Sequence, residues 1–253
     1  MYIEKLREKA LSYKEKFFYG NLSNIQEVIF NDNGLFVVGK NNDYYEIFWA
    51  VNQLDDLKYN LKKIAEKYTP IIFRYGNEYE RLKKDIEKFI LWGYEVKNTH
   101  IGFRLDLNNY HNLINNQIMV YKLEVQEIKE LMKLEESIFP LFNVTDYEYN
   151  NWINDENVLI LTIKNSDKLI GFIILEDVLD KHCFLRNIGI DKTFHGKGLG
   201  FALLNKALLM VKEKGCTKCF LWVDEGNIKA INLYKKVGFI QDLNEAEVVF
   251  IGK

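Results

Sequence analysis

The sequence predicts an α/β fold with two tandem domains, each a mostly antiparallel, twisted mixed sheet flanked by helices. The chain has 253 residues, which suits two domains of about 100–150 residues each. The predicted element order β-β-β-α-β-α-β occurs over residues 25–105 and again over residues 158–251. Between these runs, five of the ten residues at 107–116 are asparagine, which favours turns. We therefore expect a boundary at about residues 107–117 and domains at 1–110 and 117–253.

The elements of the first half are predicted from charge, apolar runs and turn residues. Residues 2–18 are expected to form a charged helix. Turn sequences at residues 31–34 and 41–43 separate three apolar runs and predict strands on either side of each turn. The expected strands are Ile25–Phe30, Leu35–Gly39, Tyr44–Val51, Pro70–Arg74 and Tyr94–Leu105, and the later helices are Leu54–Tyr68 and Glu78–Trp92.

The second half is predicted in the same way. Apolar residues at helical spacing predict helices, and Gly215 and Gly238 are placed to end two of them. The expected helices are Gln126–Ile138, Thr145–Ile153, Leu199–Lys212 and Asn227–Val237. The expected strands are Ile118–Val125, Val158–Ile163, Leu169–Leu175, Phe184–Ile190, Phe220–Val223, Phe239–Ile240 and Glu247–Ile251.

The composition excludes several classes of protein. Hydrophobic residues make up 48% and charged residues 28% of the chain, a balance typical of a folded globular protein. The 34 basic and 36 acidic residues give a net charge of −2, so a basic surface for nucleic acid or membrane is not expected. No apolar run approaches the roughly 18–20 residues that span a bilayer, and the N-terminus lacks a signal-peptide pattern. We expect a cytoplasmic protein with no nucleic-acid or membrane partner.

The stretch from Asn187 to Gly200 carries the clearest chemical signal. It is predicted as a strand, a short loop with glycines at Gly196, Gly198 and Gly200, and the start of a helix. Glycines let bare backbone amides approach a ligand closely. A helix N-terminus adds unpaired amide donors and about half a positive charge from the helix dipole. Together these features predict a site that binds a phosphate group.

This stretch resembles the acyl-CoA-binding motif of the GNAT superfamily of N-acetyltransferases, Arg/Gln-x-x-Gly-x-Gly/Ala, here from His195 to Gly200. Residues Asn227–Phe239 are similar to a later helix of the same family, Asn-x-x-Ala-x-x-Leu-Tyr-x-x-x-Gly-Phe. The resemblance covers about residues 118–253. A shorter segment, Glu135–Pro140, is similar to the enzymes that acetylate the N-terminus of a ribosomal protein, but it is too short to indicate a substrate.

The resemblance implies acetyl-CoA as the cosubstrate and no metal. In similar enzymes the amides of the glycine loop hold the pyrophosphate, with His195 and Lys197 here at the rim. Where the family has Arg or Gln, His195 lacks a fixed positive charge, although a neutral imidazole can still donate one hydrogen bond. The implied cofactor-binding residues are Ile188, Ile190, His195, Gly196, Lys197, Gly198, Leu199, Gly200, Asn227 and Tyr234.

Two of these positions are implied to take part in catalysis. The preceding strand in the family pairs with the pantetheine arm, and the Ile188 amide would stabilise the oxyanion of the tetrahedral intermediate. Tyr234 matches the general acid that protonates the leaving thiolate, because a phenol stays protonated at neutral pH. Asn227 matches a residue that touches the pantetheine or opens the last helix.

No general base is assigned. Family members carry a carboxylate near the positions of Phe184 or Trp222, and neither position is acidic here. A water chain to solvent is one alternative. The remaining candidates are Glu136, Glu176, Asp177, Asp224 and Glu225.

The first half lacks the corresponding chemistry. Its counterpart of the glycine loop, Asn52–Leu57, contains two carboxylates and no glycine, so it would repel a pyrophosphate. Phe89 stands where the second half has Tyr234 and has no proton to give. We expect a degenerate GNAT-like domain without a CoA site, which is structural or forms one wall of the acceptor cleft.

Aromatic residues and cysteines also have two interpretations. Some aromatic side chains lie where family members line the acceptor cleft, although core packing explains most of them. These are Phe139, Phe142, Tyr147, Tyr149 and Trp152. Cys216 and Cys219 form one CxxC pair, which is weak evidence for zinc, so we interpret them as packing residues.

The preferred function is an acetyl-CoA-dependent N-acetyltransferase that acetylates a primary amine of a small molecule or a peptide directly, with no covalent enzyme intermediate. The alternative is a non-catalytic acyl-CoA-binding or regulatory module, for which the missing base would be meaningful. A third hypothesis is the use of a longer acyl-CoA. The sequence leaves the acceptor, the acyl-chain preference and the oligomeric state open.

Overall fold

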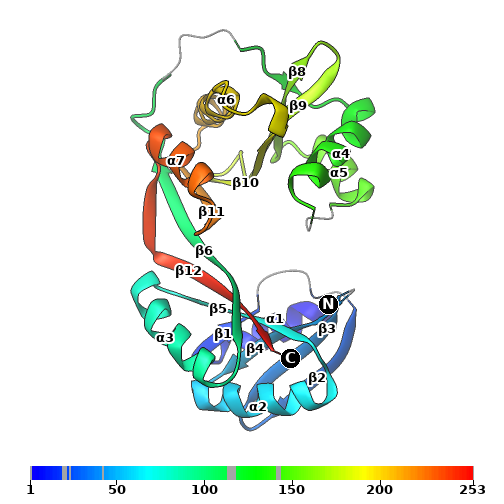
Figure 1. The fold of residues 1–253 in the computed structure, drawn as a ribbon, viewed down its shortest axis with the longest axis vertical. Coiled ribbons are helices and arrows are strands. Elements are labelled where there is room, and N and C mark those ends of the chain that lie inside the picture. Colours follow the sequence, from blue (N-terminus) through cyan, green and yellow to red (C-terminus); the bar gives the residue numbers. More distant parts are fainter. Residues whose placement is uncertain are drawn as a thin grey trace. The chain divides into compact units, whose positions relative to one another are not determined.

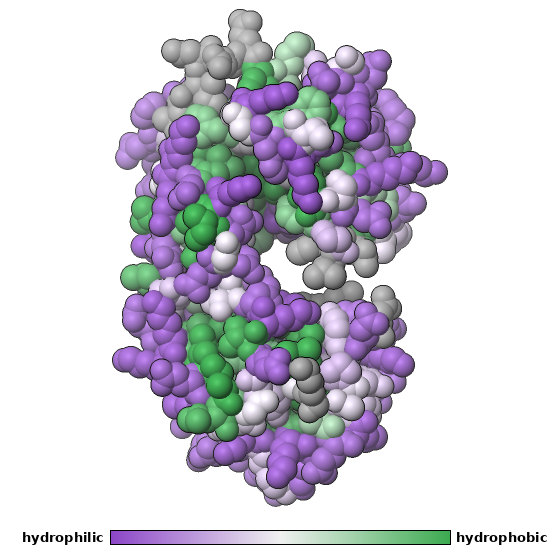
Figure 2. Space-filling view, in the orientation of Figure 1, coloured by the Kyte–Doolittle hydropathy of each residue, from purple (hydrophilic) through white to green (hydrophobic). Residues whose placement is uncertain are grey.

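The computed structural model describes residues 2–18, 22, 24–41, 43–112, 118–140 and 144–252. It confirms the mixed α/β fold, with helices α1–α7 and a mixed sheet in the described part of the chain (Figure 1). Hydrophilic side chains cover most of the face shown in Figure 2. Among the described helices, none combines the length and apolar character needed to cross a membrane.

The chain forms two compact units that are not consecutive stretches of sequence. Unit 1 consists of Met1–Ile101, Asp224–Gly226 and Leu243–Lys253, and unit 2 of Gly102–Val223 and Asn227–Asp242. These bounds differ from the ranges 1–110 and 117–253 expected from the asparagine-rich segment, of which residues 113–117 lie outside the described part. The difference arises because the last strand, β12 (Ile240–Gly252), pairs antiparallel with β5 (Ile71–Asn77) in unit 1.

Unit 1 has the strand order β2-β3-β4-β5-β12-β6. Its early elements are β2 (Ile25–Asn31), β3 (Gly34–Lys40), β4 (Tyr45–Val51) and α2 (Leu54–Lys67), followed after β5 by α3 (Tyr79–Leu91) and β6 (Glu95–Asp106). Phe73, Phe89 and Phe250 are fully buried and their rings contact one another, so β5, α3 and β12 share a core.

The helix expected over residues 2–18 is shorter in the structure. Helix α1 spans Tyr2–Leu11, and residues Glu15–Phe17 form a separate strand, β1. The Lys- and Glu-rich sequence favours a helix locally, but the chain turns and pairs with β4, and Phe17 and Phe18 are buried there. Tertiary pairing therefore overrides the local helix preference.

Strand β1 occupies a gap between two parallel strands of unit 1. Strands β4 and β5 pair only from Tyr45↔Ile71 to Ile47↔Phe73. Beyond that point β1 takes the open edge of β4, from Glu15↔Val51 to Phe17↔Trp49. The ring of Phe17 also reaches β5, where a Cβ added at Gly76 would lie 3.5 Å from it.

Unit 2 has the strand order β6-β11-β10-β9-β8-β7. Its strands are β7 (Tyr121–Lys122), β8 (Leu159–Asn165), β9 (Lys168–Glu176), β10 (His182–Ile190) and β11 (Lys218–Asp224). Strand β7 is much shorter than the expected 118–125, and the two expected final strands are one continuous strand, β12. Residues 246–252 of that strand pair with β5.

The helices of unit 2 lie on both sides of its sheet. Figure 1 shows α4 (Ile128–Ile138) and α5 (Asp146–Asn154) on one side of β8–β10 and α6 (Leu199–Glu213) on the other. The expected capping residue Thr145 accepts a hydrogen bond from the Glu148 amide at 3.2 Å. The five core positions predicted for α6 are all buried, and they are Leu203, Leu204, Ala207, Leu208 and Val211.

Candidate functional site

The central strands of unit 2 separate halfway along their length. Strands β10 and β11 run parallel and pair only from His182↔Lys218 to Leu185↔Leu221. Strand β10 continues to Ile190, and its register with β9 shifts between Leu185 and Asn187, which leaves Arg186 as an extra residue. A bulge of this kind bends a strand, so the last five residues of β10 leave the ladder with β11.

The amides of Ile188 and Ile190 face the opened side. The Asp191 amide donates to the Ile170 carbonyl of β9 at 2.8 Å. Because the backbone groups of successive strand residues point to opposite edges, the amides of Ile188 and Ile190 point away from β9, towards the gap. The β10 edge can therefore accept an extended ligand as if it were a further strand.

The glycine loop follows directly after this edge. Asp191 caps the short 3-10 turn Lys192–Phe194, and the hydrogen bond from the Thr193 amide lowers its pKa. Gly196 and Gly198 have φ of +78° and +75°, a conformation that favours glycine, and no atom lies within 4 Å of a Cβ added at either. The backbone is therefore open to a ligand at both positions.

Helix α6 begins at the end of the loop with unpaired amides. Its first helical hydrogen bond runs from the Ala202 amide to the Gly198 carbonyl at 3.0 Å. The amides of Leu199 and Gly200 precede that bond, and no described side chain caps this end of the helix. Amide donors and the helix dipole together suit a phosphate group.

His195 and Lys197 are placed differently from Gly196 and Gly198. His195 Nε2 lies 2.8 Å from the Ile190 carbonyl, so this nitrogen must donate the proton. The single N–H of a neutral His195 is thus used to hold the end of β10 against the loop. The Lys197 ammonium lies 4.7 Å from the centre of the Phe194 ring.

Helix α7 (Ile228–Val237) supplies the two remaining predicted residues. Asn227 caps it by accepting a hydrogen bond from the Ala230 amide at 3.1 Å, which is the helix-opening role weighed for this residue. Tyr234 is 5% exposed and packs beside Phe103 and Phe239. Burial, followed by the nearby Cys219, raises the pKa of Tyr234. Its phenol therefore stays protonated throughout the neutral range.

The candidate acceptor aromatics have different environments. Tyr149 is fully buried, and Phe139 packs against the same core as α4. Trp152 stands against Tyr149 and under the Arg186 guanidinium, whereas Tyr147 is 75% exposed. Phe142 lies outside the described residues. Tyr149 thus belongs to the core, and Phe139 is partly buried against it.

Several candidate bases already have partners. The Glu176 carboxylate pairs with Arg186 at 3.0 Å, and Asp177 accepts from Asn157 at 3.3 Å. Asp224 accepts from the Gly226 amide, and Glu225 accepts from Tyr79 at 2.5 Å within unit 1. Glu136 is exposed on α4. These contacts single out no base.

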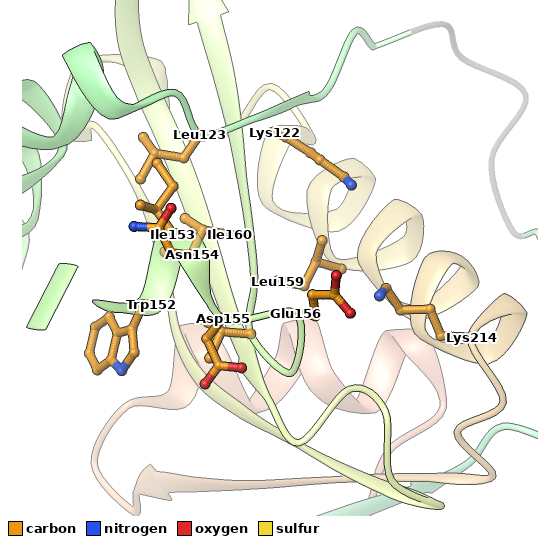
Figure 3. A pocket seen from close by; sticks show the side chains of 11 residues that line it. Lys122, Leu123, Trp152, Ile153, Asn154, Asp155, Glu156, Leu159, Ile160 and Lys214 are labelled. Carbon is orange, nitrogen blue, oxygen red and sulfur yellow. The ribbon is translucent and has the colours of Figure 1, made fainter. Parts of the chain in front are cut away.

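Unit 2 has two cavities, of which one borders the glycine loop. A cavity of about 560 Å³ is bordered by Phe194, Lys197 and Leu199 from the loop and by residues of the β8–β9 hairpin. A second, of about 340 Å³, lies by the end of α5 (Figure 3). Figure 3 shows Trp152 on the other side of this second pocket from Lys122 and Lys214, and no residue of the glycine loop lines it.

The three cysteines are buried and free. Cys183 and Cys219 are neighbours in the β10–β11 register, and the Cys219 thiol together with burial raises the pKa of Cys183. Burial raises the pKa of Cys216 to about 12. Within the described part of the chain, no three His, Cys, Asp or Glu side chains are arranged to hold a metal ion.

The sequence did not indicate one polar network beside the opened strand. Glu135 of α4 is 2% exposed and accepts hydrogen bonds from Asn187 Nδ2 at 2.8 Å and from the Tyr149 hydroxyl at 2.5 Å. The available signal was a glutamate on the apolar face of the predicted helix, next to Leu131 and Leu134.

Comparison with known proteins identifies relatives of this part of the chain. Residues 126–239 match the model of the acetyltransferase (GNAT) family. A [ribosomal protein bS18]-alanine N-acetyltransferase of Haemophilus influenzae is 30% identical over 132 residues, which cover 51% of this chain and 84% of that protein. A mycothiol acetyltransferase of Corynebacterium glutamicum is 28% identical over 100 residues, 40% of this chain and 33% of that protein.

Solved structures resemble nearly the whole chain. A GCN5-related N-acetyltransferase from Sphaerobacter thermophilus matches 90% of this chain and 82% of its own, with a TM-score of 0.65 and 12% identity. Another from Kribbella flavida matches 99% of this chain and 93% of its own, with a TM-score of 0.62 and 8% identity. At these identities the likeness shows the fold, and it extends through both units.

Proposed function

This chain belongs to the GNAT family of acetyltransferases, and we propose that it transfers the acetyl group of acetyl-CoA directly to a primary amine of a small molecule or a peptide. One arrangement carries the proposal. The edge of β10 opens away from β11 and leads through one short 3-10 turn into a glycine loop and the uncapped start of α6.

The residues present fit acetyl-CoA. Open backbone at Gly196 and Gly198 and unpaired amides at Leu199 and Gly200 would hold the pyrophosphate. The free edge at Ile188 and Ile190 would pair with the pantetheine arm. His195 contributes by donating its N–H to the Ile190 carbonyl rather than to a phosphate.

Two groups would serve the reaction. The Ile188 amide would donate to the thioester oxygen as negative charge develops on it. The buried phenol of Tyr234 would give its proton to the leaving thiolate. Its raised pKa keeps the phenol protonated, so the proton is available throughout the neutral range.

The lack of an assigned base favours an α-amine as the acceptor. An α-amine has an ordinary pKa of about 7.7–8.0 and is partly unprotonated near neutrality, whereas a lysine amine at about 10.4 needs a strong base. The name of the Haemophilus relative specifies the alanine of a ribosomal protein, which supports testing peptide N-termini first. The mycothiol relative keeps small-molecule amines in the screen.

Unit 1 is proposed to bind no acyl-CoA. Its parallel strands β4 and β5 separate as β10 and β11 do, but β1 already pairs with the open edge of β4. Helix α2 begins after Gln53, with Asp55 and Asp56 in its first turn, where a pyrophosphate would be repelled. Unit 1 would therefore have a structural or acceptor-binding role.

The test separates binding from turnover. Calorimetry with acetyl-CoA, CoA and longer acyl-CoAs is followed by a screen of peptide and small-molecule amines with the best binder. We expect tight binding that Gly198→Glu abolishes, because the carboxylate would face the pyrophosphate. Tyr234→Phe should lower turnover by roughly 10-fold to 100-fold with unchanged binding.

Two outcomes would contradict the proposal. Binding retained in Gly198→Glu would place the cofactor site elsewhere. Tight binding of acetyl-CoA without turnover of any amine would favour the alternative, a non-catalytic acyl-CoA-binding module.

A further inference from the structure

A buried carboxylate of helix α4 contacts the opened part of β10. Glu135 projects from α4 and is 2% exposed, and its partners Asn187 and Tyr149 are 8% and 0% exposed. Each of its oxygens accepts one hydrogen bond, Oε1 from Asn187 and Oε2 from Tyr149. Burying a carboxyl group is costly unless hydrogen bonds compensate, so an apolar residue would pack here at lower cost.

The network acts at one point of the strand. Asn187 is the first residue after the register shift of β10, two residues beyond the last pair with β11 at Leu185. Its side chain faces α4, as does Gly189, where a Cβ would lie 2.9 Å from Ile138 of that helix. Helix α4 therefore contacts β10 from one face of the sheet, just where the strand bends.

We propose that Glu135 is a positioning residue, which holds Asn187 and thereby fixes the direction of the Ile188 amide. This inference rests on the proposed function, because it gives that amide a reaction to serve. Asn187 and Ile188 share a peptide bond, so rotation of Asn187 turns the Ile188 N–H. A donor to a developing oxyanion must be held within about 0.5 Å and 10–20° of its productive position. Tyr149 holds the second oxygen of Glu135 and completes the anchor.

The chain offers an exchange of the two partners that tests the contact itself. Asn187→Asp places a second carboxylate against Glu135 and removes the donor. Adding Glu135→Gln restores a bond of the same length in the opposite direction, from the glutamine amide to the aspartate. The matched control is Asn205→Asp, because Asn205 is a 3% exposed amide on α6 that bonds Tyr110 and Asn112, away from β10.

Two measurements are made on the full chain. Hydrogen exchange of residues 186–190 without ligand reports the anchor, and kcat and KM for acetyl-CoA report its use. Asn187→Asp should speed exchange in this segment and lower kcat by about 10-fold or more, while KM changes less than about 3-fold. The double variant should return both to within about 3-fold of the parent, and Asn205→Asp should change neither.

The outcomes distinguish this inference from the proposed function. An unchanged kcat in Asn187→Asp, or a double variant no better than the single one, would overturn the positioning role. If the parent protein binds acetyl-CoA but acetylates no amine, the proposed function fails. In that case the exchange rates of the three proteins still decide whether Glu135 fixes the strand.

Discussion

At the scale of single residues, the glycines of the loop meet two different demands. Gly198 has a φ of +75°. A residue with a side chain adopts this backbone angle at a cost of about 1–2 kcal/mol. Gly200 lies in the first turn of α6 without a positive φ, and a Cβ there would meet Leu233 and Ile190 at ordinary contact distances of 3.6 and 3.7 Å. The two glycines have different roles only if alanine substitutions at the two positions have different effects.

We therefore expect Gly198→Ala and Gly200→Ala to have unequal effects on acetyl-CoA binding. Gly198→Ala should weaken binding by about 10-fold, because relief of the backbone strain turns the adjacent amides. Gly200→Ala should bind normally and gain up to about 1 kcal/mol of stability from helix propensity. Calorimetry and thermal unfolding measure both, and equal losses of affinity would show that Gly200 also needs bare backbone.

The residues of this site could be predicted to different degrees. The glycine loop and Asn227 were visible because spacing along the chain fixes a loop and a helix cap. The bond from His195 to the Ile190 carbonyl and the Glu135–Asn187 contact could not be, because they depend on how a strand bends. Neither a side-chain rotamer nor a β-bulge produces a repeating pattern of residue types from which it could be predicted.

At the scale of elements, strand β1 fills the strand opening of unit 1, which we propose binds no cofactor. The edge of β4 at residues 49–51 is paired with β1, whereas the corresponding edge of β10 has no partner strand in the described chain. The Trp49 indole also donates to the Arg74 carbonyl at 2.8 Å, which closes the gap further.

Hydrogen exchange should therefore distinguish the two openings. Amides of residues 49–51 should be protected equally with and without acetyl-CoA, whereas Ile188 and Ile190 should gain protection when it binds. Glu15→Pro removes the β1 amide that faces Val51 and should speed exchange at 49–51 by about 10-fold or more, without creating a second acetyl-CoA site. Glu15→Ala keeps the amide and is the control. Protection of residues 49–51 by acetyl-CoA would refute the assignment.

Strand β1 is also the main element that the sequence predicts wrongly, as part of a helix. Its residues, Glu15–Phe17, continue a charged run with good helix formers, so local preference and tertiary pairing disagree. The helices of unit 2 were predicted closely because their apolar stripes and end signals agree with the packing, as at Thr145 and Gly238.

At the scale of the whole molecule, unit 1 depends on residues distant in sequence. Residues 246–252 of β12 pair with all of β5, and Phe250 is fully buried against Phe73 and Phe89. A fragment of residues 1–110 lacks this strand and exposes unpaired edges on β5 and β6.

We expect that fragment to aggregate or remain partly unfolded, and a peptide of residues 240–252 added in trans to increase its protection from exchange in β5. A peptide of the same length with Phe250→Asp is the control, because it keeps the backbone but places a charge in the core. Cooperative unfolding of the fragment alone would show that the predicted domain 1–110 is self-sufficient.

The pairing of β12 with β5 of unit 1 also sets an order of events during synthesis. In a growing chain β5 is made early. Its neighbour β12 is made only after the described helices of unit 2. The earlier half must therefore persist with an incomplete sheet while the later half is translated. A pause or truncation late in translation would harm first the unit that was made first.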